Sequence, residues 1–390
     1  MRILIVSPTA THPANSGSRA RVQALAATLM RAGHELHMAY VKRDSPGDEA
    51  AMAAFFGGNF HLLSYRQPAR RESGLQRLTR RVRNLWDVDS RHAFGIDDWY
   101  DDAIDAPLLL LQQRLAFDAV MVEYGFLSRA LDLFDAQTLK VLDTHDVFAG
   151  RHRQFIAQGL QPEWFSTRAA DEGIAVRRAD VTIAIQAGEI DHFRQLGARR
   201  VVEVGHLQTL QRIHPTPAAG ARMLFVGGSS PINADGIGHF IGQVLPRIRQ
   251  QLPAAVLQVA GGVCERLAQA PGVELLGRVD DLLAAYAGAG LVVNPVRLGT
   301  GLNIKSAEAL GHGLPLLSSS TGARGFEPLI GQGLLCEDEP EAMARAALSV
   351  LCDPARARAL SDAAWDWMSR SNQRHTQTLL DLFSAAGPRS

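Results

Sequence analysis

The residues best suited to chemistry lie in the stretch Gly290–Glu327. Lys305 and Glu308 are three residues apart in a helical pattern from about Asn303 to Gly311, so both side chains belong to one helical face. A glycine-bearing loop, Arg297–Gly301, precedes that helix. Because a helix N-terminus attracts anions, the pattern favours a diphosphate at the loop and Lys305, with a hydroxyl-rich group at Glu308. An ordinary strand–helix connection with both side chains in solvent fits the spacing equally well.

Apolar runs alternate with helical patterns along the whole chain, which is typical of doubly wound α/β domains. Several runs are continuous rather than alternating, as expected for a parallel sheet covered on both faces. In the first half we expect strands at Arg2–Ser7, Glu35–Val41, Phe60–Ser64, Phe117–Glu123, Lys140–Asp143, Val181–Ile185 and Arg200–Val204. In the second half we expect them at Met223–Val226, Val256–Ala260, Val273–Leu276, Leu291–Val293, Leu314–Leu317 and Leu334–Cys336.

The chain of 390 residues is long enough for two such domains. We expect the first at 1–205 and the second at 222–371. Residues 206–221 contain prolines and small residues with little periodicity, which indicates a linker. Within the first domain, Ser18–Ala32 has an amphipathic helical pattern that ends at Gly33. Residues 372–390 are expected to form a C-terminal helix.

His145 is the candidate for chemistry in the first half. It follows the predicted strand Lys140–Asp143, and ligands of open α/β sheets gather at the carboxyl ends of strands. An imidazole there could orient a hydroxyl or relay a proton. The alternative is a histidine that helps to cap the next helix, beside Asp143 and Thr144. Arg151 is a second candidate from the same loop.

Composition excludes several classes of protein. Lys+Arg and Asp+Glu both number 40, so no global field favours nucleic acid. The three cysteines include no C-x-x-C pair, which disfavours a disulfide framework or a zinc site and favours a cytoplasmic setting. The first loop lacks G-x-G-x-x-G, and no P-loop motif occurs. The opening residues are too strand-like for a signal peptide, and no apolar run is long enough to span a membrane.

A strongly basic stretch, Arg66–Trp86, has leucines and a valine at near-helical spacing. It fits a peripheral contact with an anionic membrane surface, or a basic helix packed on its own domain. The D-x-D at Asp87–Asp89 follows this helical stretch rather than a strand, so we interpret it as coincidence and predict no metal site. The acidic patch Asp97–Asp102 has no role that the sequence assigns.

The stretch Gly299–Gly325, GTGLNIKSAEALGHGLPLLSSSTGARG, resembles the nucleotide-sugar signature of retaining glycosyltransferases of the family 4 type. The resemblance implies the GT-B fold, with two Rossmann-like domains facing across a cleft and a C-terminal helix that crosses back to the first. It implies transfer of a sugar from a UDP- or GDP-sugar to a hydroxyl of a glycan or lipid-linked acceptor, with retention of configuration. The implied setting is polysaccharide or glycolipid biosynthesis, with no metal or other cofactor.

The same resemblance implies the site residues. In that family a glutamate that ends a Glu–seven residues–Glu pattern binds the ribose, and Glu308 matches it, whereas Thr300 stands at the first position. A histidine in a loop comparable to that of His145 lies close to the reacting sugar. The implied donor-binding residues are Gly17, Gly228, Ser229, Arg297, Thr300, Gly301, Leu302, Asn303, Lys305 and Glu308.

Two departures from the family pattern leave alternatives open. The first glutamate is absent, and Ser229, Ser230 and Asn233 stand where an arginine and a lysine often grip the diphosphate. Arg297 and Lys305 would then supply the charge. A non-catalytic scaffold on the same fold is one alternative. A sugar-nucleotide epimerase is another, although the acid and base carboxylates that it needs are not identified. Gly17 could also serve only the turn before its helix.

Overall fold

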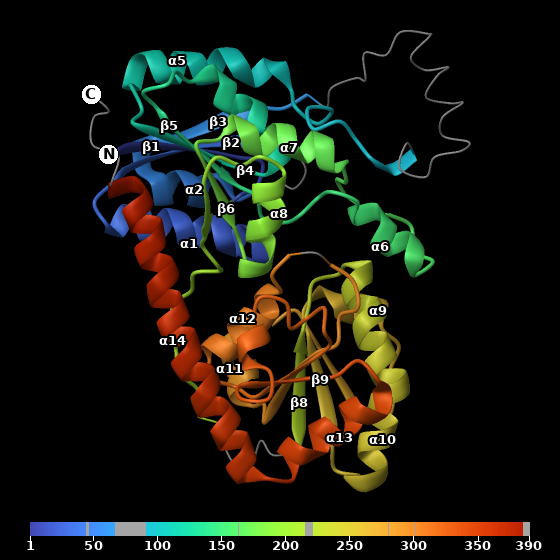
Figure 1. The fold of residues 1–390 in the computed structure, drawn as a ribbon. Helices are drawn as coiled ribbons and strands as arrows, with labels where there is room; N and C mark the ends of the chain where they lie inside the picture. Colours follow the sequence, from blue (N-terminus) through green and yellow to red (C-terminus); the bar gives the residue numbers. More distant parts are fainter. Residues whose placement is uncertain are drawn as a thin grey trace. The chain divides into compact units, whose positions relative to one another are not determined.

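In the computed structural model, the described residues are 1–43, 47–66, 91–162, 164–214, 221–279, 281–299 and 301–384. The chain divides into two compact units. The first unit is made by Met1–Leu207 together with the end of the chain from His375, and the second by Gln208–Arg374. Each unit is a parallel β-sheet with helices packed on it (Figure 1). This arrangement confirms the predicted α/β fold class.

The first unit contains seven parallel strands in the order β3-β2-β1-β4-β5-β6-β7. All seven strands predicted for this half are present, with ends that differ by at most a few residues. Their bounds are β1 Arg2–Ser7, β2 Glu35–Lys42, β3 Phe60–Ser64, β4 Ala119–Glu123, β5 Leu139–Asp143, β6 Val181–Ala184 and β7 Val201–Glu203.

The helices of the first unit cover both faces of its sheet. One face packs Val22 of α1, Met52 of α2 and Phe383 near the end of the chain, while the other packs Leu108 of α5 and Val176 of α7. Both faces of the sheet are therefore covered by packed side chains, which explains why its strands are continuous apolar runs. The helices are α1 Gly17–Arg31, α2 Glu49–Phe56, α5 Asp105–Leu115, α6 Arg151–Ala157, α7 Ala169–Arg178 and α8 Ile190–Gln195.

The second unit contains six parallel strands in the order β10-β9-β8-β11-β12-β13. The six strands predicted for this half are also present: β8 Arg222–Val226, β9 Val256–Ala260, β10 Val273–Gly277, β11 Leu291–Asn294, β12 Leu316–Ser318 and β13 Leu334–Cys336. The helices are α9 Pro231–His239, α10 Leu245–Gln251, α11 Leu282–Ala287, α12 Ile304–Gly311, α13 Pro340–Leu351 and α14 Pro354–Ser384.

The C-terminal helix is longer than predicted. The pattern indicated a helix over 372–390, whereas α14 begins at Pro354 and is described to Ser384. Proline suits the first turn of a helix, and neither glycine nor a second proline interrupts the stretch that follows. From His375 on, its residues belong to the first unit. Its leucines at 379 and 382 pack in the core of that unit.

The acidic patch has a structural role that the sequence did not reveal. Asp97 accepts two hydrogen bonds from Arg178, at 2.6 and 2.7 Å, and Asp101 accepts from the backbone N–H of Ala103. These carboxylates therefore fix the chain before α5. The basic stretch Arg66–Trp86, apart from Arg66, and the D-x-D lie outside the described residues. Among the helices that the structure describes, none combines the length and apolar character required to cross a bilayer.

Candidate functional site

Each sheet has a switch point at its centre. In the first unit β1 lies between β2 and β4, and in the second β8 lies between β9 and β11. At such a point the connections leave the sheet in opposite directions, so the loops that follow the two adjacent strands diverge and leave space at the carboxyl edge. In the second unit the candidate residues lie on these loops or on the helices that follow them. In the first unit Gly17 follows β1, whereas His145 and Arg151 follow β5, the strand next to β4.

In the second unit, two loops flank the switch point. The loop after β8 leads into α9, where Ser230 caps the helix by accepting a hydrogen bond from the N–H of Asn233 at 3.3 Å. The loop after β11 leads into α12. A Cβ at Gly236 would lie 2.8 Å from the carbonyl oxygen of Pro295. Glycine at this position therefore allows α9 to approach the loop after β11 closely.

Lys305 connects the two loops. It lies in the first turn of α12, and its Nζ donates to Oδ1 of Asn233, which follows β8, at 2.7 Å. Nζ also lies 3.5 Å from Oδ1 of Asn303. Burial lowers the pKa of Lys305 to about 8, although the nearby Glu308 opposes the shift. A half-buried ammonium next to the N-terminus of a helix is suited to bind an anion.

This pKa predicts that the affinity for a nucleoside diphosphate falls as pH rises. Between pH 7 and 9 the charged fraction of a group with a pKa of about 8 falls roughly tenfold, and above pH 7 the diphosphate itself is fully ionised. Bound anion favours charged Lys305, so binding takes up a proton above pH 8. We expect the Kd for UDP to rise about tenfold from pH 7 to pH 9 in calorimetric titrations.

A matched variant controls for other titrating groups. Arginine keeps its charge over this range, so Lys305→Arg should bind UDP with a Kd that is nearly independent of pH. An equally steep pH dependence in this variant would assign the titration to another residue.

Glu308 is half-buried on α12, one turn after Lys305. Its Oε2 accepts a hydrogen bond from the hydroxyl of Tyr286 at 3.1 Å, and Tyr286 is fully buried. Burial raises the pKa of Glu308, while the Tyr286 hydrogen bond and Lys305 oppose the rise. Tyr286 therefore holds the carboxylate in place and leaves its other oxygen for a ligand, such as a pair of hydroxyls. Sequence reasoning did not identify Tyr286, because it comes from α11.

The other donor-binding candidates lie on the same two loops, with different surroundings. A Cβ at Gly228 would meet nothing within 4 Å, so the backbone there is open. Arg297 donates two hydrogen bonds to Asp235, at 3.0 and 2.6 Å, which neutralises part of its charge. Asn303 is the N-cap of α12, and its side chain makes no capping hydrogen bond to the backbone of the helix. Gly301 and Leu302 lie just before that cap and Ser229 lies before α9, whereas Thr300 lies outside the described residues.

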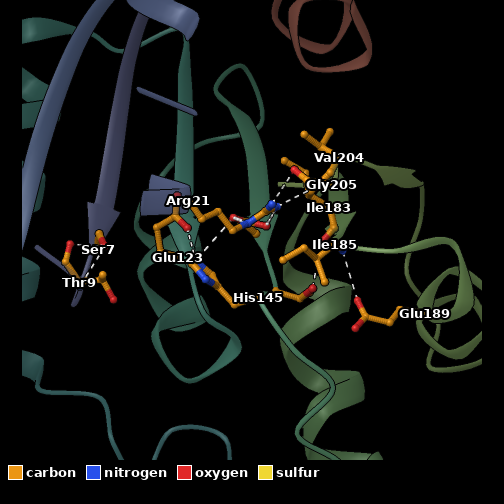
Figure 2. Close-up of polar contacts among 12 residues, drawn as sticks. Ser7, Thr9, Arg21, Glu123, His145, Ile183, Ile185, Glu189, Val204 and Gly205 are labelled. Carbon is orange, nitrogen blue, oxygen red and sulfur yellow. Dashed lines mark hydrogen bonds and ion pairs between the residues drawn. The ribbon is translucent and has the colours of Figure 1, made fainter. Parts of the chain in front are cut away.

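A buried polar cluster lies at the carboxyl edge of the first sheet and consists of Arg21, Glu123, Asp143 and His145. Figure 2 labels three of its members, Arg21, Glu123 and His145. Glu123 ends β4 and Asp143 ends the neighbouring β5, so the parallel register brings them side by side. Arg21, from α1, donates to both oxygens of Asp143, at 2.8 and 2.7 Å. Two other N–H groups of Arg21 donate to the carbonyl oxygens of Gly205 and Val204. The charges of Arg21 and Asp143 therefore both have partners.

His145 is part of this cluster and does not cap a helix. Its Nε2 lies 2.5 Å from Oε2 of Glu123 and 3.5 Å from Oδ2 of Asp143. The next helix, α6, has Gly150 as its N-cap, so the capping alternative is wrong. Burial lowers the pKa of His145 to about 4, although Asp143 opposes the shift. The imidazole is therefore neutral at pH 7.

The protonation of the two carboxyls follows from their neighbours. Burial and the adjacent Asp143 raise the pKa of Glu123 well above its ordinary value. Burial also disfavours ionised Asp143, but Arg21 outweighs it and holds the pKa of Asp143 below its ordinary value. The cluster thus contains one ion pair, and burial favours the protonated form of its second carboxyl. The carboxyl of Glu123 faces both Nε2 of His145 and the carboxylate of Asp143, so either group can accept a hydrogen bond from its protonated form.

The ligand types in this cluster could also bind a metal ion. One oxygen of Glu123, one of Asp143 and one nitrogen of His145 lie within 4.8 Å of one another. However, Arg21 occupies both oxygens of Asp143, and its positive charge opposes a second cation. The arrangement favours a hydrogen-bonded network over a metal centre.

The two remaining first-unit candidates differ in their surroundings. Gly17 is the first residue of α1, directly after the loop that follows β1 at the switch point. Arg151 begins α6 and donates to Asp146 at 2.8 Å, so it is engaged in a local ion pair. Arg21 and Glu123 were missed by sequence reasoning. The available signal was a charged residue on the apolar face of a helix and a carboxylate that ends an apolar strand.

Residues 220–353 match the family model of glycosyl transferases group 1. The matched segment runs from the start of β8 to the end of α13 and contains Lys305 and Glu308. No curated protein matches this sequence.

The fold of the whole chain resembles that of several solved glycosyltransferase structures. Sucrose-phosphate synthase from Thermosynechococcus elongatus aligns with a TM-score of 0.67 at 16% identity, covering 99% of this chain and 100% of that chain. HepE from Anabaena, in complex with UDP, aligns with a TM-score of 0.66 at 15% identity, covering 99% and 100%. The pneumococcal O-GlcNAc transferase GtfA, in complex with UDP and GlcNAc, aligns with a TM-score of 0.64 at 9% identity, covering 98% and 99%. These similarities confirm the GT-B class of fold.

Proposed function

We propose that this protein is a glycosyltransferase that moves a sugar from a nucleotide-sugar to a hydroxyl of a glycan or lipid-linked acceptor. The observation that carries the proposal is the position of Lys305 and Glu308. Both are half-buried on α12, beside the switch point of the second sheet, within the segment that matches the glycosyl transferases group 1 model. UDP is the nucleotide named in the HepE and GtfA structures, which favours a UDP-sugar as the donor.

In this proposal the second unit binds the donor. Lys305 and the first-turn amides of α12 bind the diphosphate, and Glu308 accepts hydrogen bonds from the ribose hydroxyls. Gly228, Ser229 and the Gly301–Asn303 segment bring backbone groups close to the phosphates. Arg297 adds charge from the loop after β11, shared with Asp235. These groups neutralise the diphosphate, so the proposed reaction requires no metal ion.

The proposed reaction retains configuration, as in family 4 enzymes. The bond between the anomeric carbon and the diphosphate oxygen breaks, and the acceptor oxygen bonds to the same face of that carbon. The acceptor proton goes to an oxygen of the departing diphosphate. Since no side chain forms a covalent intermediate in this route, the protein contributes by positioning the reactants and stabilising the negative charge of the leaving group. We assign the acceptor to the first unit, where His145 orients the hydroxyl of the acceptor. The proposed setting of the reaction is polysaccharide or glycolipid synthesis.

A thermal-shift panel with UDP, GDP and ADP tests the donor site and identifies the base. A ligand at about a hundred times its Kd adds roughly 2.7 kcal/mol to stability, which raises Tm by several degrees. We expect UDP to produce such a shift in the wild-type protein. Glu308→Ala should reduce it, because hydrogen bonds to a charged acceptor contribute about 1.5–3 kcal/mol.

Glu341→Ala is a matched control, since Glu341 is an exposed glutamate of α13 in the same unit. It should show the full wild-type shift. The absence of a shift with all three nucleotides would overturn the donor site. With the preferred nucleotide-sugar and no acceptor, slow release of free sugar would indicate a transferase, whereas a changed but intact sugar-nucleotide would indicate an epimerase.

A further inference from the structure

Three strained backbone positions occur close together in the first unit. Among the described residues, four non-glycine residues have positive φ: Ala116, Tyr124, His145 and Trp164. Ala116 only ends helix α5. The other three, at φ 71°, 60° and 67°, belong to one group of rings. Strain of this kind costs about 1–3 kcal/mol per residue and is concentrated at functional sites.

The rings of this group contact one another around Tyr124. Its ring stacks on His145 with the centroids 4.0 Å apart, and its centroid lies 6.5 Å from that of Trp164. Trp164 also meets Trp99 edge-on, at 5.5 Å. The guanidinium of Arg43 lies over the ring of Trp99, 3.6 Å from the ring centroid. Tyr124 therefore connects the buried polar cluster to an aromatic group that includes Trp164.

The segment that carries Trp164 is tied to the loop after His145. Ser166 Oγ accepts from the backbone N–H of His152 at 3.1 Å and lies 2.8 Å from its Nδ1. Thr167 exchanges backbone hydrogen bonds with that loop, donating to Phe148 and accepting from Gly150. The two segments thus form one scaffold that holds the imidazole of His145 and the indole of Trp164 in fixed positions.

Trp164 differs from its neighbours in exposure. Tyr124 and Phe126 are 7% and 0% exposed, whereas Trp164 is 43% exposed. We propose that Trp164 is an acceptor-binding residue, whose exposed indole stacks on the apolar face of a sugar ring in the acceptor. The proposal rests on the proposed glycosyl transfer and specifies its acceptor as a carbohydrate.

The chemistry of the group favours a sugar over a lipid chain. A pyranose ring presents a flat face of C–H groups bordered by hydroxyls, which matches one exposed ring with polar neighbours. The indole N–H is a hydrogen-bond donor, and the cluster of Glu123 and His145 is separated from Trp164 only by the ring of Tyr124. A lipid tail would bury a longer apolar surface and use none of these polar groups.

Saturation-transfer NMR tests this proposal with the methyl glycosides of glucose, galactose, mannose and N-acetylglucosamine as probes. We expect at least one glycoside to receive saturation from the full-length protein, mainly on the protons of one ring face. Trp164→Phe keeps an aromatic face and should retain most of the signal. Trp164→Ala should lose at least nine-tenths of it, while its Tm with and without UDP stays close to the wild-type values.

Farnesyl phosphate, measured in the same way, is the competing probe. Equal glycoside signals in Trp164→Ala would overturn the proposal, as would saturation of farnesyl phosphate with no glycoside signal. A protein that binds UDP but none of these probes would reject the role of Trp164 and leave the donor site intact. A protein that binds neither UDP nor a glycoside would reject the proposed function itself.

Discussion

Arg21→Met is expected to destabilise the first unit by about 3–5 kcal/mol, because removing one partner of a buried ion pair leaves the other charge uncompensated. Asp143 is completely buried, and both of its oxygens accept from Arg21. The measurement is hydrogen exchange of peptides from β4 and β5 in the intact protein. Their exchange should accelerate by roughly two to four orders of magnitude. Peptides from β8, in the second unit, provide the internal reference.

The pH dependence of this effect tests its electrostatic origin. In the wild-type protein the pKa of Asp143 is held below its ordinary value, so Asp143 stabilises the fold at neutral pH. Without Arg21, burial is the largest remaining influence on Asp143 and raises its pKa, although His145 and Glu123 oppose the rise. Falling pH then protonates the carboxyl and relieves the burial penalty. The destabilisation by Arg21→Met should therefore shrink as pH is lowered from 8 to 5.

Arg199→Met is the control for loss of an arginine in the same unit. Arg199 is exposed and pairs with Asp180 at 2.9 Å, and exposed pairs contribute at most about 1 kcal/mol. An effect of Arg21→Met as small as that of Arg199→Met would show that the buried pair contributes little. The double variant Arg21→Met, Asp143→Leu should recover much of the stability, since no buried charge remains.

Lys305→Ala is expected to weaken UDP binding about 10- to 100-fold, because a hydrogen bond to a charged group contributes about 1.5–3 kcal/mol. The effect on kcat for transfer or donor hydrolysis should be larger, about 10²- to 10³-fold, since charge on the diphosphate grows as the sugar leaves. Binding is measured by calorimetry at pH 7, where Lys305 is charged.

Two variants of the same site show whether charge or packing is responsible. Lys305→Arg retains the charge and should keep most of the affinity. Arg297→Gln should lose less affinity than Lys305→Ala, because Arg297 already shares its charge with Asp235. If Lys305→Ala binds UDP as tightly as the wild-type protein, Lys305 does not contact the diphosphate and the assignment of the donor site to α12 is wrong.

The strands and the helices α1 and α12 were predictable because their signals are local. A parallel strand buried on both faces is a continuous apolar run, and all thirteen predicted strands are present. The helix that carries Lys305 and Glu308 was predictable in the same way, since their spacing of three residues fixes a common face. The long α14 was underestimated. Its first half, from Pro354 to 371, is rich in arginine, aspartate and alanine and has a weak apolar pattern.

The partners of these residues could not be predicted. Asn233 meets Lys305 across 72 residues, and Tyr286 meets Glu308 across 22. Strand order at the switch point decides both contacts, and a single sequence does not specify which strands become neighbours.

In the first unit, too, the contacts that matter join parts of the chain that are distant in sequence. Arg21 pairs with Asp143 across 122 residues, and the exposure of Trp164 depends on the rings that surround it. The sequence by itself determined the elements and one helical face with a lysine and a glutamate. Only the tertiary structure decided the pKa shifts in the buried polar cluster and the exposure of the neighbouring Trp164. Both depend on contacts between distant parts of the chain, because those contacts set burial and the nearest charges.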